Sequence, residues 1–356
     1  MSFRTRVIAI SSLLALLIAA FLLGMFLSPE RAQESAVQEP LLPIAALGDI
    51  AEAEIVHKGT VEVTLRRKDG GWEALTAGHA YPGSADRIEA FVRGVAGLKR
   101  GRIVGSDRGG LLAELGLGED SARLLVLRRG TGKGEMGLLV GKRGPSGDED
   151  YMQVKGTDAV YLVRGSLAFF LTQDRTYWYE LHVLPDDARG GAAISRISVT
   201  GRLALGGSEG GMLQGSYTLR RGIPADSLRR GIPADSLTRG TGERDGEWTM
   251  PGEKRHINQM AASGMANSLS LLEAVDFAEQ TGGGAGGSGG AGESGKDGGL
   301  RVEVSTQEGK TYSFLVRPGP RAGQYLVTTS WSAWTYILDE LPLRRAVPLV
   351  SELLLQ

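Results

Sequence analysis

The chain has 356 residues, with 40 lysines and arginines against 41 aspartates and glutamates, so its formal net charge is -1. This balance lacks the basic excess that nucleic-acid-binding proteins carry, and we expect no nucleic acid partner. The absence of cysteine excludes disulfides, thiolate metal sites and a cysteine nucleophile. The length suits about two domains.

The N-terminus contains an uncharged apolar stretch, residues 7–27, preceded by Arg4 and Arg6. A helix of that length spans about 30 Å, the thickness of a bilayer core. The basic flank favours a cytoplasmic N-terminus and an extracytoplasmic location for the rest of the chain. We therefore expect residues 1–27 to form a cytoplasmic tip and a single transmembrane anchor. The anchor residues in contact with lipid would include Val7, Leu14, Leu17, Phe21 and Leu27.

A cleaved signal peptide is the alternative interpretation of this segment. Its apolar region would be about 7–15 residues long and would precede a small-x-small cleavage site. The residues after Leu27 read SPERAQESA, which matches such a site poorly. Residues 28–45 contain Pro29, Pro40 and Pro43 and are predicted to form a stalk.

The pattern that follows predicts a first α+β module over residues 46–184. Residues 61–65 and 72–75 alternate as strands on either side of an Asp69-Gly70-Gly71 turn. Asp86 and Glu89 suggest a capping box. The helix after it would bury an apolar stripe made of Ile88, Phe91, Val92 and Val95. Short helices are predicted at 111–115 and 167–171, and strands at 123–129, 134–140, 150–154 and 159–163.

A linker over 185–193 leads to a second module, residues 194–356, in which this order of elements recurs. The turn Arg244-Asp245-Gly246-Glu247-Trp248 matches Lys68-Asp69-Gly70-Gly71-Trp72. Strands are predicted at 197–199, 216–219, 300–305, 311–316 and 324–328, and 334–338 takes the place of 167–171. A helical stripe would contain Ile257, Met260, Ala261, Met265, Leu269 and Leu272. The expected fold is therefore a transmembrane helix followed by two similar α+β modules of antiparallel strands with one main helix each. An internal duplication explains this pattern, and two unrelated α+β domains are the alternative.

Two insertions interrupt the second module, at 220–246 and 279–299. The first contains a nonapeptide, residues 220–228, that is repeated without change as 229–237. It reads as a duplicated surface loop, or alternatively as a basic docking loop carrying Arg220, Arg221, Arg229 and Arg230. The second is a glycine-rich loop that holds part of the 53 glycines and is typical of flexible coil.

The short motifs with a chemical meaning are weak in this context. Residues 290–296 match the spacing of a phosphate-binding loop, but Asp297 stands where a Mg²⁺-binding Ser or Thr belongs, so we expect no nucleotide. Residues 206–210 fit G-x-S-x-G without a helix to follow. Acidic runs at 148–150 and 186–187 read as solvated turns. The four histidines, His57, His79, His182 and His256, lack metal-ligand spacing. We expect no catalytic, cofactor-binding or metal-binding residues, and no cofactor.

Two aromatic clusters are the most suggestive side chains. They consist of Tyr177, Trp178, Tyr179, Trp331, Trp334 and Tyr336. Tryptophan and tyrosine are enriched both in cores and at protein interfaces. The clusters therefore either close the core of each module or form a partner surface.

The strand-turn-strand ending in Asp-Gly-Gly-Trp72 is followed by a helix with a basic end, Leu98-Lys99-Arg100, and by Leu115-Gly116-Leu117. Strand 159–163 and an Asp174-Arg175 step come next. With the anchor, these features resemble the bacterial domain-of-unknown-function family 4340, closely over residues 46–200 and weakly over 200–356. The resemblance implies one N-terminal anchor in the cytoplasmic membrane, an extracytoplasmic (periplasmic) bulk, and association with ABC transporters of the gliding type, without established catalytic residues.

The expected function is thus that of a non-enzymatic accessory or interaction subunit of an ABC-type transporter or envelope assembly. Its partners would be the lipid bilayer and membrane-embedded transporter subunits. The alternative is an envelope protein or enzyme that binds polysaccharide or cell-wall material at a shallow site between the modules.

Overall fold

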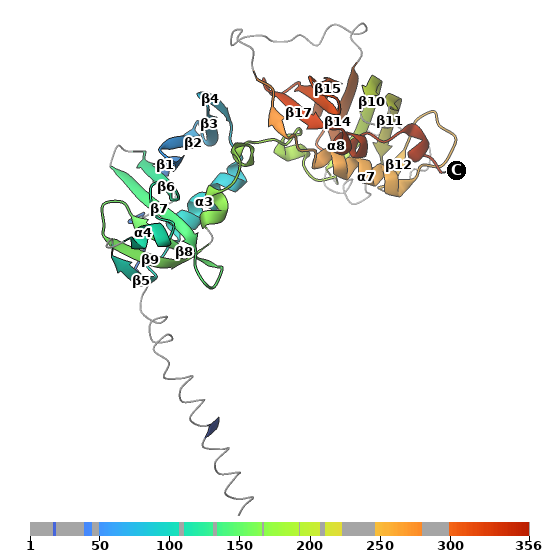
Figure 1. Cartoon of the computed structure of the whole chain (residues 1–356). Helices are drawn as coiled ribbons and strands as arrows, with labels where there is room; N and C mark the ends of the chain where they lie inside the picture. Colours follow the sequence, from blue (N-terminus) through green and yellow to red (C-terminus); the bar gives the residue numbers. More distant parts are fainter. Residues whose placement is uncertain are drawn as a thin grey trace, which may run out of the picture. The chain divides into compact units, whose positions relative to one another are not determined.

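The computed structural model describes residues 17–18, 39–44, 50–106, 110–130, 134–165, 167–191, 193–206, 211–222, 246–279 and 299–355. The chain divides into two compact units, residues 1–179 and 180–356 (Figure 1). Across the described part of the chain, we find no helix with the length and apolarity to cross a membrane. Of the expected anchor residues only Leu17 is described, and Val7, Leu14, Phe21 and Leu27 lie outside that part.

The first unit is built on a nine-stranded antiparallel sheet in the order β4-β3-β2-β1-β6-β7-β8-β9-β5. Its strands are β1 (Ile50–His57), β2 (Thr60–Lys68), β3 (Gly71–Thr76), β4 (His79–Pro82), β5 (Arg102–Ser106), β6 (Arg123–Arg129), β7 (Glu135–Arg143), β8 (Glu149–Val154) and β9 (Ala159–Arg164). Its helical elements are α3 (Ala85–Ala96), α4 (Leu111–Glu114), α5 (Leu167–Leu171) and the 3₁₀ turn η2 (Arg175–Trp178). The sequence predicts most of these elements but not β1, which is central to the sheet.

The three hairpins that join β1 to β4 share one turn chemistry. Asp69 and Gly70 both have positive φ, 48° and 81°, as a two-residue turn of type I′ requires. The turn residues of the other two hairpins, Lys58-Gly59 and Ala77-Gly78, also have positive φ. The predicted Asp-Gly turn is confirmed, and its backbone twist matches the twist of the strands it joins.

Helix α3 buries the stripe that the sequence predicts, Ile88, Phe91, Val92 and Val95. The predicted cap is wrong, because Ser84 and not Asp86 stands at the N-cap position, and its side chain makes no capping hydrogen bond. The helix end is held instead by backbone, since the Ser84 N–H donates to the carbonyl of Trp178 at 2.9 Å. This bond ties the start of α3 to the end of the unit.

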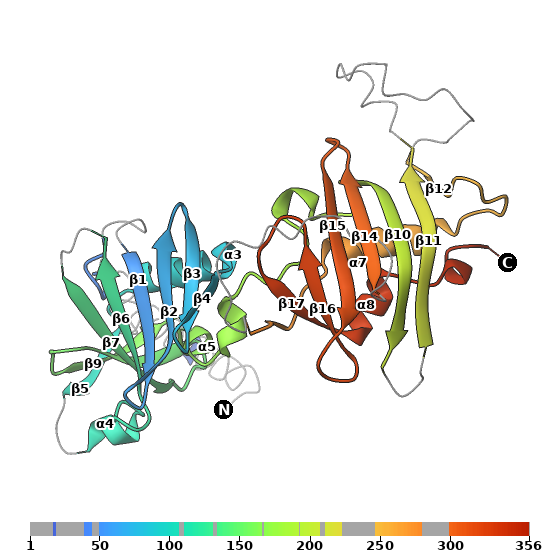
Figure 2. The same cartoon turned by 90° about the horizontal axis from the view of Figure 1, so that it is seen from above.

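The second unit is built on an eight-stranded antiparallel sheet in the order β12-β11-β10-β14-β15-β16-β17-β13, with α7 and α8 on one face (Figure 2). Its strands are β10 (Ile194–Leu205), β11 (Gly211–Arg221), β12 (Trp248–Thr249), β13 (Asp276–Phe277), β14 (Leu300–Thr306), β15 (Thr311–Pro318), β16 (Gln324–Thr329) and β17 (Thr335–Asp339). Its helical elements are α7 (Gln259–Ser270), α8 (Glu340–Ala346), η3 (Asp186–Ala188) and η5 (Val350–Glu352). The expected α+β class, with antiparallel strands and one main helix per unit, is confirmed.

Two details of the second unit differ from the prediction. Met260 is 86% exposed, and the buried face of α7 uses Ala262 and Ala266 beside Met265 and Leu269. The expected helix at 334–338 is replaced by strand β17, Thr335–Asp339. Helix α8 follows this strand, as α5 follows β9 in the first unit. The sequence pattern misses the buried face of α7 because alanine is only weakly hydrophobic and contributes little to a periodic apolar pattern.

The two sheets follow the same order of elements. Each begins with a hairpin, β1–β2 or β10–β11, whose first strand also pairs with the second strand after the main helix, β6 or β14. The first strand is irregular at the same place in both, after Ile50 opposite Arg129 and after Ile194 opposite Thr306. Residues 50 and 194 therefore occupy matching positions in the two units.

Candidate functional site

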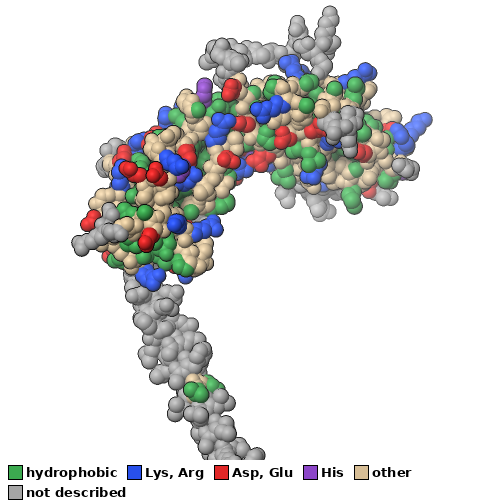
Figure 3. Space-filling model, viewed as in Figure 1, with side chains coloured by type: hydrophobic (Ala, Val, Ile, Leu, Met, Phe, Trp, Pro, Cys, Tyr) green, Lys and Arg blue, Asp and Glu red, His purple; other side chains and the backbone are tan. Residues whose placement is uncertain are grey.

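The outer face of the first sheet carries a row of charges that pair with one another. Arg66, Glu52, Arg128 and Glu135 lie directly opposite one another on β2, β1, β6 and β7. Arg128 also donates two hydrogen bonds to Glu54, at 2.6 and 3.0 Å. Hydrogen bonds to Glu54 and Glu52 raise the pKa of Arg128. Figure 3 shows acidic and basic side chains intermingled on the visible face of this unit. Charges neutralised in this way stabilise the sheet locally and do not form a surface of one sign.

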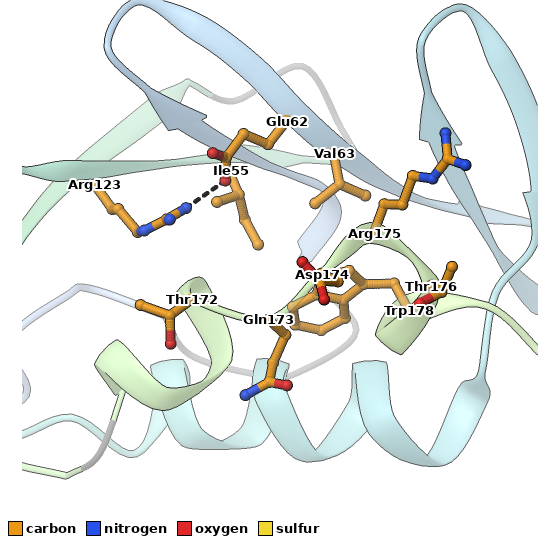
Figure 4. Close-up of a pocket in the computed structure, with 10 residues that line it drawn as sticks. All are labelled: Ile55, Glu62, Val63, Arg123, Thr172, Gln173, Asp174, Arg175, Thr176 and Trp178. Atoms are coloured by element: carbon orange, nitrogen blue, oxygen red, sulfur yellow. Dashed lines mark hydrogen bonds and ion pairs between the residues drawn. The ribbon is translucent and has the colours of Figure 1, made fainter. Parts of the chain in front are cut away.

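A cavity of about 480 Å³ opens on the other face of the same sheet (Figure 4). It lies between the β1–β2 hairpin and the segment that joins α5 to η2. The lining residues are Ile55, Glu62, Val63, Arg123, Thr172, Gln173, Asp174, Arg175, Thr176 and Trp178. Both walls belong to the first unit, so the cavity is complete within it.

Glu62 lines this cavity because of a β-bulge. Residues Val63 and Leu65 of β2 are buried, so strict alternation would place Glu62 on the opposite face of the sheet. Ile55 pairs with Val63 while Val56 pairs with Val61, which leaves Glu62 as the extra residue. A bulge of this kind redirects a side chain. Glu62 consequently forms an ion pair with Arg123 of β6, which shares its face with the buried Leu125 and Leu127.

The floor of the cavity is apolar. Ile55, Val63 and Trp178 are 1%, 3% and 1% exposed. The Trp178 ring meets the edge of Phe91 in α3, with ring centroids 5.1 Å apart. Trp178 is therefore a core residue whose ring also forms part of the cavity wall.

The second wall presents polar groups. Thr172 and Gln173 donate to carbonyls of α5, at 2.9–3.1 Å. Asp174 stands at the N-cap of η2, and its side chain makes no capping hydrogen bond. In Figure 4 its carboxylate lies between the Glu62–Arg123 pair and Arg175. The apolar floor can contact an apolar part of a ligand. The guanidinium groups around it can donate hydrogen bonds to the ligand, and the carboxylates can accept them.

A smaller cavity of about 100 Å³ occupies the matching place in the second unit. It lies between the β10–β11 hairpin and the segment after α8, and its apolar lining includes Leu205, Met212, Leu213, Val347 and Leu349. Glu352 at its rim accepts a hydrogen bond from the Leu349 N–H at 2.8 Å. The same place in the scaffold is thus polar in one unit and mainly apolar in the other.

The six aromatic residues singled out by the sequence divide into two groups. Trp178, Tyr179 and Tyr336 are buried, and Tyr177, Trp331 and Trp334 are half-buried. The Tyr179 hydroxyl hydrogen-bonds Thr76, and Trp334 lies against Phe277 with ring centroids 5.3 Å apart. Only the half-buried group offers aromatic surface to a partner.

Asp150 is not the solvated turn residue that the acidic run predicts. It is 1% exposed, and its carboxylate accepts a hydrogen bond from the Ala168 N–H at 2.9 Å, at the start of α5. Burial raises its pKa. By contrast, Asp187 is bound by Lys310 and Tyr312, both at 2.6 Å, and Lys310 lowers its pKa. Each carboxylate has a structural role within its own unit.

The short motifs considered in the sequence fall at the following places in the structure. Within the described ranges, no group of three or more acidic or histidine side chains is placed to hold a metal ion. Residues 290–296 lie outside those ranges, and the strand β11, not a helix, follows the G-x-S-x-G residues. Sequence reasoning also missed Glu62 and Arg123, which only the bulge brings together.

These features define a protein of two α+β units on antiparallel sheets, with a binding-type cavity in the first. The family model described as a domain of unknown function, DUF4340, matches residues 72–286, more than half of the chain, and the chain belongs to this family. The match begins in β3 of the first unit and ends after β13 of the second, before β14. No curated protein and no solved structure matches the chain.

Proposed function

We propose that this chain is a non-enzymatic, single-pass membrane-anchored extracytoplasmic protein that acts as an accessory or interaction subunit of an ABC-type transporter or envelope assembly. The observation that carries the proposal is the uncharged stretch 7–27 behind Arg4 and Arg6, directly ahead of two ordered units. The resemblance described under the sequence analysis implies a transporter setting, whereas the family model itself is described only as a domain of unknown function.

The cavity of the first unit supports a binding role. Two carboxylates, Glu62 and Asp174, line it, and Glu62 forms an ion pair with Arg123. The apolar floor and polar rim suit recognition of a polar segment of a partner. The half-buried aromatics Tyr177, Trp331 and Trp334 add surface of the kind that interfaces favour.

We also propose that the two units arose by internal duplication. Trp72 and Trp248 are both buried at the start of a strand and both follow an Asp-Gly turn sequence. Arg67 pairs with Trp72 across β2–β3, and Arg221 pairs with Trp248 across β11–β12. Their guanidinium carbons lie 4.7 and 5.8 Å from the ring centroids. Experimental structures of the units should superpose with Trp72 on Trp248 and Ile50 on Ile194, and another register would contradict a common origin.

The topology can be tested by cysteine labelling, because the chain has no native cysteine. Ser2→Cys marks the expected cytoplasmic end, and Glu308→Cys marks a side chain of the second unit that is 75% exposed. In intact cells, a membrane-impermeant maleimide should label residue 308 and not residue 2, and permeabilised cells should show both. Labelling of residue 2 alone in intact cells would refute the orientation.

The partner can be tested by affinity purification from mild detergent. The native chain should recover an ABC ATPase and a permease, and a chain with Trp331→Ala or Arg123→Ala should recover less. Glu308→Ala, on an exposed loop, is the matched control and should recover both. Repeated recovery of no membrane protein, or of cell-wall enzymes instead, would count against the proposal.

A further inference from the structure

Among the residues that the structure describes, strand β11 has an edge that is largely without a partner strand. It pairs along its full length with β10, but on its other side only Arg220 and Arg221 pair with β12. Within the part of the chain that the structure describes, no residue pairs with 211–219 on that side, which leaves nine residues of free strand edge. Figure 2 shows β11 at the side of the sheet, with β12 only at its far end.

The first unit closes the matching edge. There β3 pairs with β2 from Thr64 to Lys68, and β4 pairs with β3 in turn. In the second unit the counterpart of β3 is reduced to the two residues of β12, and β12 is the last strand on that side of the order. The open edge of β11 is therefore a difference between two otherwise matching units.

The open edge also lacks the features that normally protect strand edges. Such strands are usually short, bulged, or carry charge or proline. Edge strand β4 has four residues and ends in Pro82, and β13 has two residues. Residues 211–219 read GMLQGSYTL, with no charge and no proline, and their pairing with β10 is regular. Such a strand is a template for another strand.

We propose that β11 pairs antiparallel with β11 of a second copy of this chain, around a two-fold axis at Gly215. This register places Leu213 opposite Tyr217 of the second copy and Gln214 opposite Ser216. Because β11 alternates, with Leu213, Gly215 and Tyr217 buried, the buried faces of the two sheets continue into each other. Pairing over nine residues forms about eight to ten backbone hydrogen bonds.

Two observations favour a second copy over another occupant. A closed two-fold interface needs a surface that complements itself, and an uncharged strand meets itself without like-charge contacts. The mainly apolar cavity of this unit is lined by Met212 and Leu213 at the start of the strand and by Leu349. Met212 and Leu349 are 55% and 40% exposed, so the partner's strand would cover apolar surface as well as backbone.

A charge exchange on the exposed face of β11 tests the pairing. Q214K with S216K places lysine opposite lysine twice across the axis, and Q214E with S216E does the same with glutamate. Each double variant alone should dissociate to monomers, with a dimer dissociation constant raised about tenfold or more. An equimolar mixture should regain the dimer, because each lysine then faces a glutamate. Analytical ultracentrifugation of the full chain in mild detergent measures the mass of the native chain, of each double variant alone and of their mixture.

Thr200→Lys is the matched control, because it adds a lysine to the same face on β10, directly opposite Ser216 but one strand inside the edge. It should dimerise like the native chain, and the melting temperatures of all variants should show that the fold is kept. Mixing Q214C with S216C should give a disulfide-linked dimer on oxidation, whereas Q214C alone should not. A monomeric native chain, or double variants that still dimerise, would overturn the proposal; the latter would assign the dimer to another surface.

Discussion

Trp178→Ala should destabilise the first unit strongly. The side chain is 1% exposed, packs against Phe91, and forms the floor of the cavity beside Ile55 and Val63. Truncating a buried tryptophan to alanine costs about 3–5 kcal/mol in unfolding free energy. For a unit of this size that corresponds to a fall in melting temperature of about 10–20 °C. Because a domain is stabilised by only about 5–15 kcal/mol, a loss of this size removes a large share of the stability of the unit.

Native-state hydrogen exchange read by mass spectrometry localises the effect. Protection should fall across β1, β2 and α3 and stay unchanged in β14 to β16, because the tryptophan packs within its own unit. Trp331→Ala is the control, since that ring is half-buried in the second unit and its loss should cost about 1–2 kcal/mol there. If Trp178→Ala keeps native melting and native protection but no longer recovers a membrane partner, Trp178 is a contact residue and the assignment to the core is refuted.

Other substitutions test smaller features. In Gly94→Ala, the new Cβ in α3 would meet no other atom, and the unfolding free energy should rise by about 0.5–1 kcal/mol. In Gly101→Ala, the new Cβ would lie 1.7 Å from the Leu162 carbonyl oxygen, and the unfolding free energy should fall by about 1–3 kcal/mol. Chemical denaturation measures both changes. Burial raises the pKa of Asp150 above its ordinary 3.8, so its contribution to stability is full below that value and is lost as the pH rises through the folded pKa. The unfolding free energy of Asp150→Asn should therefore increase relative to that of the native chain as the pH rises above 3.8, and parallel stability curves would contradict this. Lys310→Ala should raise the pKa of Asp187 towards its ordinary range in an NMR titration, and an unmoved pKa would show that Tyr312 holds the carboxylate alone.

The turns and apolar stripes of this fold could be predicted because their causes are local. Asp69-Gly70 imposes a tight turn wherever it occurs, and Ile88, Phe91, Val92 and Val95 follow the period of a helix. Strand β1 was missed because Ala51, Glu52, Ala53 and Glu54 give little apolar alternation, although β1 is held between β2 and β6. Its stability comes from cross-strand partners that are 14 and 76 residues away in sequence, such as Arg66 and Arg128 for Glu52.

The candidate site could not be predicted because its contacts also join residues that are distant in sequence. Glu62 looks like a solvent-facing residue of an alternating strand, and only its register against β1 shows that a bulge turns it toward Arg123. Asp150 sits in an acidic run that reads as a turn, and only the approach of α5 makes it a buried acceptor. In both cases the deciding contact is non-local.

The two units differ mainly at positions that do not take part in pairing the central strands of the sheets. The hairpin that begins each sheet and the segment that ends each unit enclose a cavity in both, and neither is needed to pair the central strands. In the first unit this place holds Glu62, Arg123 and Asp174, and strands β3 and β4 close the sheet edge beside it. In the second it is mainly apolar, and among the described residues nothing pairs with the outer edge of β11 from 211 to 219. A polar cavity on a closed sheet suits a ligand or a partner's segment, whereas an apolar cavity beside a free strand suits another strand. If both proposals hold, the two units would use one fold for two kinds of contact, and a single chain would bind its own copy through one unit and a different partner through the other.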